Sequence, residues 1–162
     1  TMRTLLKADP AVAGAVAHAL GPPLVRLWTQ LVVLPTVGSG VRDCLAAMAA
    51  TPTGLPHIAS ELLPHLTAVM AEPAAHPSGV VAEVLEMART LVDHSRGDGD
   101  GDGDEAPGGV PDAVFALMVP IAELVCSTDD GSSMQSGADT LASFVHVARS
   151  QLLALTLPDG SP

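Results

Sequence analysis

The chain has 162 residues, of which 48% are hydrophobic, and its mean hydropathy is +0.38. It contains two Phe, one Trp and no Tyr, so the core must consist of aliphatic side chains, which favours packed helices over β-sandwiches. The formal net charge of −11 disfavours direct binding to nucleic acids or to anionic membranes, because those surfaces repel an acidic protein.

Apolar residues recur at helical spacing along most of the chain. Asp9-Pro10 predicts a helix start, with the Asp side chain as N-cap and proline at the first helical position. Gly21-Pro22-Pro23 predicts the end of that helix, because proline lacks the N–H donor that a helix interior requires. The full pattern predicts helices at 11–20, 24–34, 41–50, 55–71, 78–94, 111–126 and 133–155.

Several single residues within these helices carry further expectations. Pro64 and Pro120 lie inside expected helices and predict kinks. Cys44 and Cys126 lie within apolar helical patterns, so we expect two buried free thiols rather than a disulfide or a zinc site. Oxygen atoms of the turn at 128–133 are expected to cap the helix that follows.

Three Ser-Gly pairs predict an internal repeat. Ser39-Gly40, Ser78-Gly79 and Ser136-Gly137 are each expected to open a helix. The first two pairs are 39 residues apart, and the last two are 45 apart once the 13 residues of 97–109 are left out. Both intervals are close to the period of roughly 40 to 47 residues of HEAT and armadillo repeats. A helical bundle without repeats is the alternative.

The segment 97–109 repeats Gly and Asp and has no hydrophobic anchor, so we expect a disordered, solvated loop. Its negative charge makes it the candidate contact for a basic partner, and a tolerated acidic spacer is the alternative. The candidate contact residues are Asp98, Asp100, Asp102, Asp104 and Glu105.

Catalytic, metal and cofactor sites have little support in the sequence. The acidic segment matches the first positions of an EF-hand loop, but Gly109 stands where a bidentate Glu is needed. The six histidines form no HExxH or other compact ligand set. There is no G-x-S-x-G elbow and no P-loop. We therefore expect no enzyme activity, no cofactor and no dedicated metal site.

Three segments carry a resemblance to a known family. The distinctive one, 126–137, reads CSTDDGSSMQSG, and the segments LLPHLTAVMAEP at 62–73 and DPAVA at 9–13 accompany it. Together they resemble the importin-β (karyopherin) family, in particular its importin-9-like branch. That resemblance implies an α-solenoid nuclear transport receptor with basic cargo such as core histones. It implies binding of Ran with GTP only through repeats outside this chain.

The expected fold is all-α, with residues 1–162 forming a partial α-solenoid of about three HEAT-type helical hairpins from a longer receptor. The expected function is binding of basic protein cargo for nuclear import, with the protein in the cytoplasm and nucleus. The alternative is a HEAT-repeat scaffold or regulatory subunit in which this segment has a purely structural role. No direct contact with nucleic acid or membrane is expected.

Overall fold

The computed structural model describes residues 9–95 and 110–154, and every regular element in these two ranges is helical. No strand occurs within them, which confirms the all-α class. The elements in chain order are α2 (Pro10–Leu31), α3 (Pro35–Ala49), α4 (Leu55–Ala71), the 3₁₀ turn η1 (Pro73–Ala75), α5 (Ser78–Ser95), α6 (Asp112–Phe115), α7 (Met118–Ser127), α8 (Gly131–Val147) and α9 (Arg149–Ala154).

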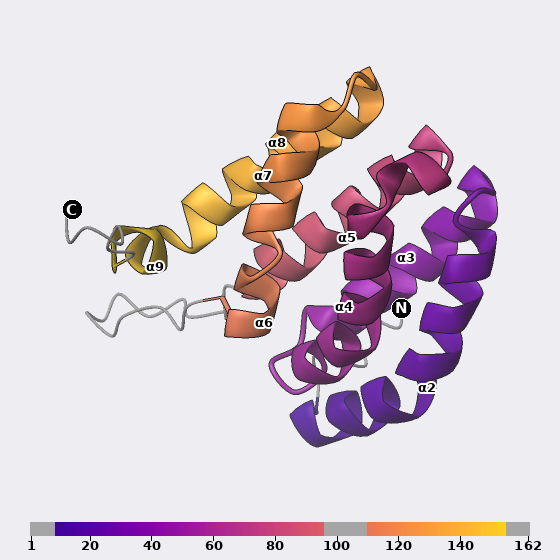
Figure 1. Cartoon of the computed structure of the whole chain (residues 1–162). Helices are drawn as coiled ribbons and strands as arrows, with labels where there is room; N and C mark the ends of the chain where they lie inside the picture. Colours follow the sequence, from indigo (N-terminus) through magenta and orange to yellow (C-terminus); the bar gives the residue numbers. More distant parts are fainter. Residues whose placement is uncertain (1–8, 96–109, 155–162) are drawn as a thin grey trace.

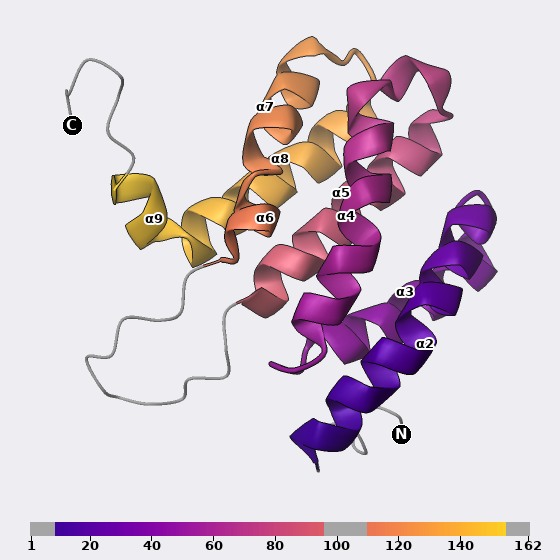
Figure 2. The same ribbon diagram turned by 60° about the horizontal axis from the view of Figure 1, so that its bottom comes forward.

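Three helix pairs lie side by side in the order of the chain (Figure 1). Helix α2 packs on α3, α4 on α5, and α7 on α8. Helices α2, α4 and α7 contact one another in succession and form a first layer, while α3, α5 and α8 form a second. The central pair therefore has a neighbouring pair on each side, and a second view keeps the same order (Figure 2).

The predicted helix end at Gly21-Pro22-Pro23 is wrong, because α2 continues through both prolines to Leu31. The prolines remove the donors to the carbonyl groups of His18 and Ala19, and both of those residues are exposed to solvent. Water can therefore replace the lost helical hydrogen bonds. Gly21 is buried, and a Cβ there would lie 3.0 Å from Cδ1 of Ile58 in α4, so tertiary packing holds this part of α2 in place.

The expectation that each Ser-Gly pair opens a helix is correct only for Ser78-Gly79, where α5 begins. Ser39-Gly40 lies inside α3, which starts at Pro35, and Ser136-Gly137 lies inside α8. All three pairs nevertheless fall on the second helix of a pair. The pairs therefore mark equivalent helices but different positions along them.

Two expected long helices are divided. Pro120 has no N–H to donate to the carbonyl of Ala116, four residues earlier, and the chain leaves the helix at Ala116, the C-cap of α6. The expected kink is thus a break between α6 and α7. The last helix begins at Gly131 and ends at Val147, with Ala148 as its C-cap, and α9 follows.

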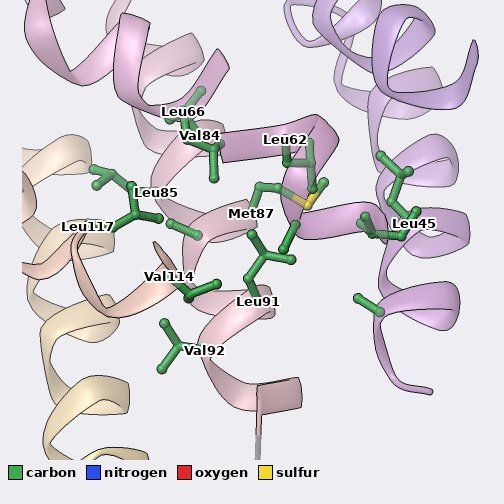
Figure 3. Close-up of a cluster of buried hydrophobic side chains, with 14 of the residues drawn as sticks. Leu45, Leu62, Leu66, Val84, Leu85, Met87, Leu91, Val92, Val114 and Leu117 are labelled. Carbon is green, nitrogen blue, oxygen red and sulfur yellow. The ribbon is translucent and has the colours of Figure 1, made fainter. Parts of the chain in front are cut away.

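The core is aliphatic, as the composition predicts, and α5 contributes the most side chains to it. Side chains from α3, α4, α5 and α6 converge in the close-up, with Leu45, Leu62 and Met87 meeting on one side (Figure 3). Full burial of each such side chain contributes about 1.5–3 kcal/mol to folding. The aromatic part is small: the rings of Phe115 and Phe144 meet edge to face, with centroids 6.2 Å apart.

The two cysteines are free thiols, but the expectation that they are buried is wrong. Cys44 is half-buried and Cys126 is exposed. On α7 the buried positions are Ile121 and Leu124. Cys126 lies two residues after Leu124, about 200° further round the helix, and therefore on its outer side.

Candidate acidic binding surface

The five predicted contact residues, Asp98, Asp100, Asp102, Asp104 and Glu105, lie outside the described residues. The residues on both sides of this segment are described. Ser95 is buried at the end of α5, and its hydroxyl donates to the carbonyl of Leu91 at 2.7 Å. The last described residue before the acidic segment therefore lies at the end of α5, in the second layer.

Val110, the first described residue after the acidic segment, is held by Gln151 of α9. Val110 is buried, and its N–H donates to Oε1 of Gln151 at 2.8 Å. In return, Nε2 of Gln151 donates to the carbonyl of Val110 at 2.8 Å. A single side-chain amide thus satisfies both backbone groups of Val110. Asp112, exposed two residues later, adds another negative charge near this point.

An acidic row runs along α5 toward the start of the same segment. Glu83, Glu86 and Asp93 lie at positions i, i+3 and i+10, on one side of the helix. Their side chains are all partly exposed. The opposite side of α5 is buried in the core. We call Glu83, Glu86, Asp93 and the neighbouring Asp139 of α8 the acidic row. The three acidic positions on α5 can be recognised in the sequence, whereas the position of Asp139 beside them cannot.

Arg89 is the basic residue among these acids. Its guanidinium lies 3.9 Å from Glu86, 3.6 Å from Asp93 and 3.9 Å from Asp139. One positive charge therefore faces three carboxylates, and the surplus charge of the group is negative. Because these side chains are exposed, each ion pair contributes only about 0–1 kcal/mol to stability. The surplus charge is available to attract a cation at short range.

Arg42 of α3 makes a second ion pair between helices of the second layer. Its Nη1 donates to Oε2 of Glu83 at 2.7 Å. Together with the pair between Arg89 and Asp139, this contact links α3 to α5 and α5 to α8 across one surface. Two basic side chains therefore face four acidic ones on this surface of the second layer.

Residues 126–137, which carry the resemblance to a known family, include the N-cap of α8. Oδ2 of Asp130 accepts from the hydroxyl of Ser132 and from the backbone N–H of Ser133, both at 2.7 Å. These bonds hold the pKa of the Asp130 carboxyl below its ordinary value of 3.8. Asp130 is the N-cap of α8, so the predicted capping role of this turn is confirmed.

Gly137, later in the same stretch, sits where α8 meets α7. A Cβ at this position would lie 2.3 Å from Cγ2 of Val125. Ser133 and Thr140 are buried on the same side of α8. In this stretch, therefore, Asp130 caps α8 and Gly137 lets α8 pack closely on α7.

Within residues 9–95 and 110–154, no group of three or more His, Cys, Asp or Glu side chains is placed to hold a metal ion. His18 and His57 meet between α2 and α4 with ring centroids 5.3 Å apart. None of the described helices combines the length and the apolar character needed to cross a membrane.

Comparison of the chain with protein families, curated proteins and solved structures gives no match. The helical architecture and the distribution of charge are therefore the features of this chain that bear on its function.

Proposed function

We propose that this chain is a segment of a HEAT-type α-solenoid whose second layer and acidic segment bind a basic protein. Three antiparallel helix pairs stacked in chain order are the arrangement that such repeats produce. In that scheme α3, α5 and α8 are the equivalent second helices of consecutive repeats. In the alternative fold, a helical bundle without repeats, the helix pairs would not be equivalent to one another.

One observation carries the binding proposal: the acidic row ends where the acidic segment begins. Asp93 lies two residues before Ser95, the last described residue before that segment. The segment adds five carboxylates, and Asp112 follows where the chain returns. A continuous negative field at this place favours encounter with a Lys- or Arg-rich partner, and salt weakens that attraction.

The biological role that we propose is nuclear import of basic cargo, with core histones as the first candidate. This role rests on the resemblance of residues 126–137 to the importin-β family and on the acidic surface. In this proposal the protein works in the cytoplasm and the nucleus, and Ran with GTP binds repeats outside this chain. The second candidate is a HEAT-repeat scaffold, which is favoured by the purely structural roles of Asp130 and Gly137.

The test is a binding titration of the chain with a core-histone dimer at two salt concentrations. Three variants are compared with the parent chain: deletion of 97–109, the pair Glu86→Gln with Asp93→Asn, and the matched pair Glu61→Gln with Glu123→Gln. The last pair removes the same charge from exposed positions on α4 and α7, in the first layer. Circular dichroism establishes that each variant is folded.

We expect salt-sensitive binding that the deletion and the α5 pair weaken and that the first-layer pair leaves nearly unchanged. Equal weakening by both charge pairs would assign the effect to net charge and would contradict a defined surface. Absence of binding by the folded parent chain would overturn the receptor proposal and favour the scaffold.

A further inference from the structure

Two exposed histidines from different helices meet in the first layer. The ring of His18 in α2 and the ring of His57 in α4 have centroids 5.3 Å apart, and their planes are inclined by 62°. Both side chains are exposed to solvent. The two residues are 39 positions apart in the chain, so no local motif announces the pair. Because neutral imidazole is the commonest metal ligand in proteins, such a pair is a candidate for metal binding.

Close packing of α2 on α4 fixes the positions of the two histidines. Gly14 lies four residues before His18, and a Cβ at Gly14 would lie 3.2 Å from Cβ of Thr53. Gly21 lies three residues after His18, and a Cβ there would lie 3.0 Å from Cδ1 of Ile58. The two chain segments therefore approach closely on both sides of the ring contact. A ligand pair that is mounted on packed helices in this way is held in place before any metal binds.

The separation of the two rings agrees with two ligands of one tetrahedral zinc ion. A Zn–N bond of about 2.0–2.1 Å places the ion roughly 3.2 Å from the centre of each imidazole ring that binds it. Two rings at the tetrahedral angle then have centres about 5.2 Å apart, whereas the right angle of a square-planar site gives about 4.5 Å. The observed separation is 5.3 Å. Rotation about χ2 turns the nitrogen atoms toward the ion and leaves the ring centre nearly in place, since that centre lies close to the Cβ–Cγ axis.

We propose that His18 and His57 bind a Zn²⁺ ion and that the ion links α2 to α4. The imidazoles occupy two of four tetrahedral positions and water occupies the others, because no group of three or more potential ligands forms within residues 9–95 and 110–154. Glu61, exposed one turn after His57 on α4, adds a negative charge that favours a cation there. With half the ligands of a structural zinc site, the expected Kd is roughly 1–200 μM. This site is independent of the proposed cargo.

The test combines three single variants with two measurements. His18→Ala and His57→Ala each remove one ligand, and His65→Ala is the matched control, because His65 is also exposed on α4. Isothermal titration calorimetry with zinc chloride gives the stoichiometry and the Kd. Urea denaturation followed by circular dichroism, in zinc and in a chelator, gives the effect on stability. Each variant is compared with itself, so a change in its intrinsic stability does not affect the result.

We expect the parent chain and His65→Ala to bind zinc equally and to be stabilised by it. At a free zinc concentration of about 100 times the Kd, the equilibrium constant for folding should rise about 100-fold. His18→Ala and His57→Ala should each bind roughly tenfold more weakly or worse, because one of two ligands is gone. Mg²⁺, which prefers oxygen ligands, should not stabilise the parent through this pair, so His18→Ala should leave its effect unchanged.

Three results would overturn the site. Zinc binding that survives the loss of either His18 or His57 would assign the ion to other groups. An equal loss of affinity in His65→Ala would indicate scattered binding to surface histidines. A parent chain with the same stability in zinc and in chelator would show that the ion does not link the two helices.

Discussion

The central pair, α4 and α5, buries large aliphatic side chains against both neighbouring pairs, whereas α8 buries mainly small and polar ones. The buried residues of α8 are Ser133, Gly137, Thr140 and Phe144. The hydroxyl of Thr140 lies 3.0 Å from the carbonyl of Leu85 and 2.7 Å from that of Ser136. Yet α5 and α8 form the most extensive contact between helices in the described structure.

This contrast shows two ways of joining helices within one chain. The centre depends on the volume of side chains that fill the space between helices. The α8 end depends on close approach of backbones, which small residues permit, and on a few hydrogen bonds. Removal of volume should therefore harm the centre most, and addition of volume should harm the α8 end.

The largest effect expected in the central pair comes from Leu62→Ala in α4. Leu62 is fully buried in the core, so truncation leaves a cavity and should lower the free energy of unfolding by about 2–5 kcal/mol. That is a large part of the roughly 5–15 kcal/mol that stabilises a typical domain. Urea denaturation followed by circular dichroism measures the loss. The control Leu153→Ala removes the same atoms from an exposed side chain and should cost less than about 0.5 kcal/mol.

The next effect tests the close approach at the α8 end. Gly137→Ala puts a methyl group 2.3 Å from Cγ2 of Val125, so α7 and α8 must move apart. Overpacking of this kind costs about 1–3 kcal/mol, which exceeds the gain of about 1 kcal/mol that alanine brings to a helix interior. The variant should therefore be less stable in urea, and Val125→Ala in the same chain should restore part of the loss.

Gly40→Ala is the matched control, since Gly40 lies inside α3 and a Cβ there meets nothing within 4 Å. Its stability should rise by about 0.5–1 kcal/mol. If both glycine variants changed stability in the same direction, close approach would not be the property that distinguishes Gly137.

A smaller change is expected at Trp28, in the helix pair formed by α2 and α3. Its ring is buried, and Nε1 has no hydrogen-bond acceptor among the described residues. Trp28→Phe removes an unpaired donor whose burial costs about 1–3 kcal/mol, which offsets the loss of ring area. We expect stability within about 1 kcal/mol of the parent, compared with a loss of about 3–5 kcal/mol for Trp28→Ala.

Circular dichroism is the appropriate measurement for the Trp28 variants, because the chain has one tryptophan and the substitutions remove its fluorescence. A cost for Trp28→Phe close to that of Trp28→Ala would mean that the indole N–H contributes to the fold.

Local rules predicted most of the helices of this protein. The bounds of α4 agree with the expected range 55–71, and Asp9 caps α2 as predicted, accepting from the N–H groups of Ala11 and Val12. These features depend on residues that are close in sequence. The predicted stop at Pro22-Pro23 failed, because it weighed local helix breaking without the packing of Gly21 against Ile58.

The same distinction applies to the candidate site: its local sequence features could be predicted, and its contacts between distant residues could not. The acidic character of 97–109 and the row on α5 can be predicted from sequence, since both are contiguous or periodic. The contribution of Asp139 required the packing of α8 on α5, which brings it to Arg89. The clamp of Gln151 on Val110 joins residues 41 positions apart, and no local pattern announces it.

The smallest expected effect concerns the N-cap of α8, the helix whose packing depends on hydrogen bonds. Asp130→Ala removes the acceptor for Ser132 and Ser133, whereas Asp129→Ala removes an equal charge from the adjacent exposed residue. The pKa of Asp130 is lowered in the folded protein. Its carboxylate therefore adds stability that is fully present above the unfolded value of 3.8 and is lost as the pH falls below it.

We expect Asp130→Ala to unfold at lower urea concentration than Asp129→Ala at pH 7, and the difference between them to shrink as the pH is lowered below 3.8. A difference that stayed constant over this range would show that the cap does not depend on the charged carboxylate. The comparison isolates one hydrogen-bonded cap from the general effect of negative charge, because both variants have the same net charge at neutral pH.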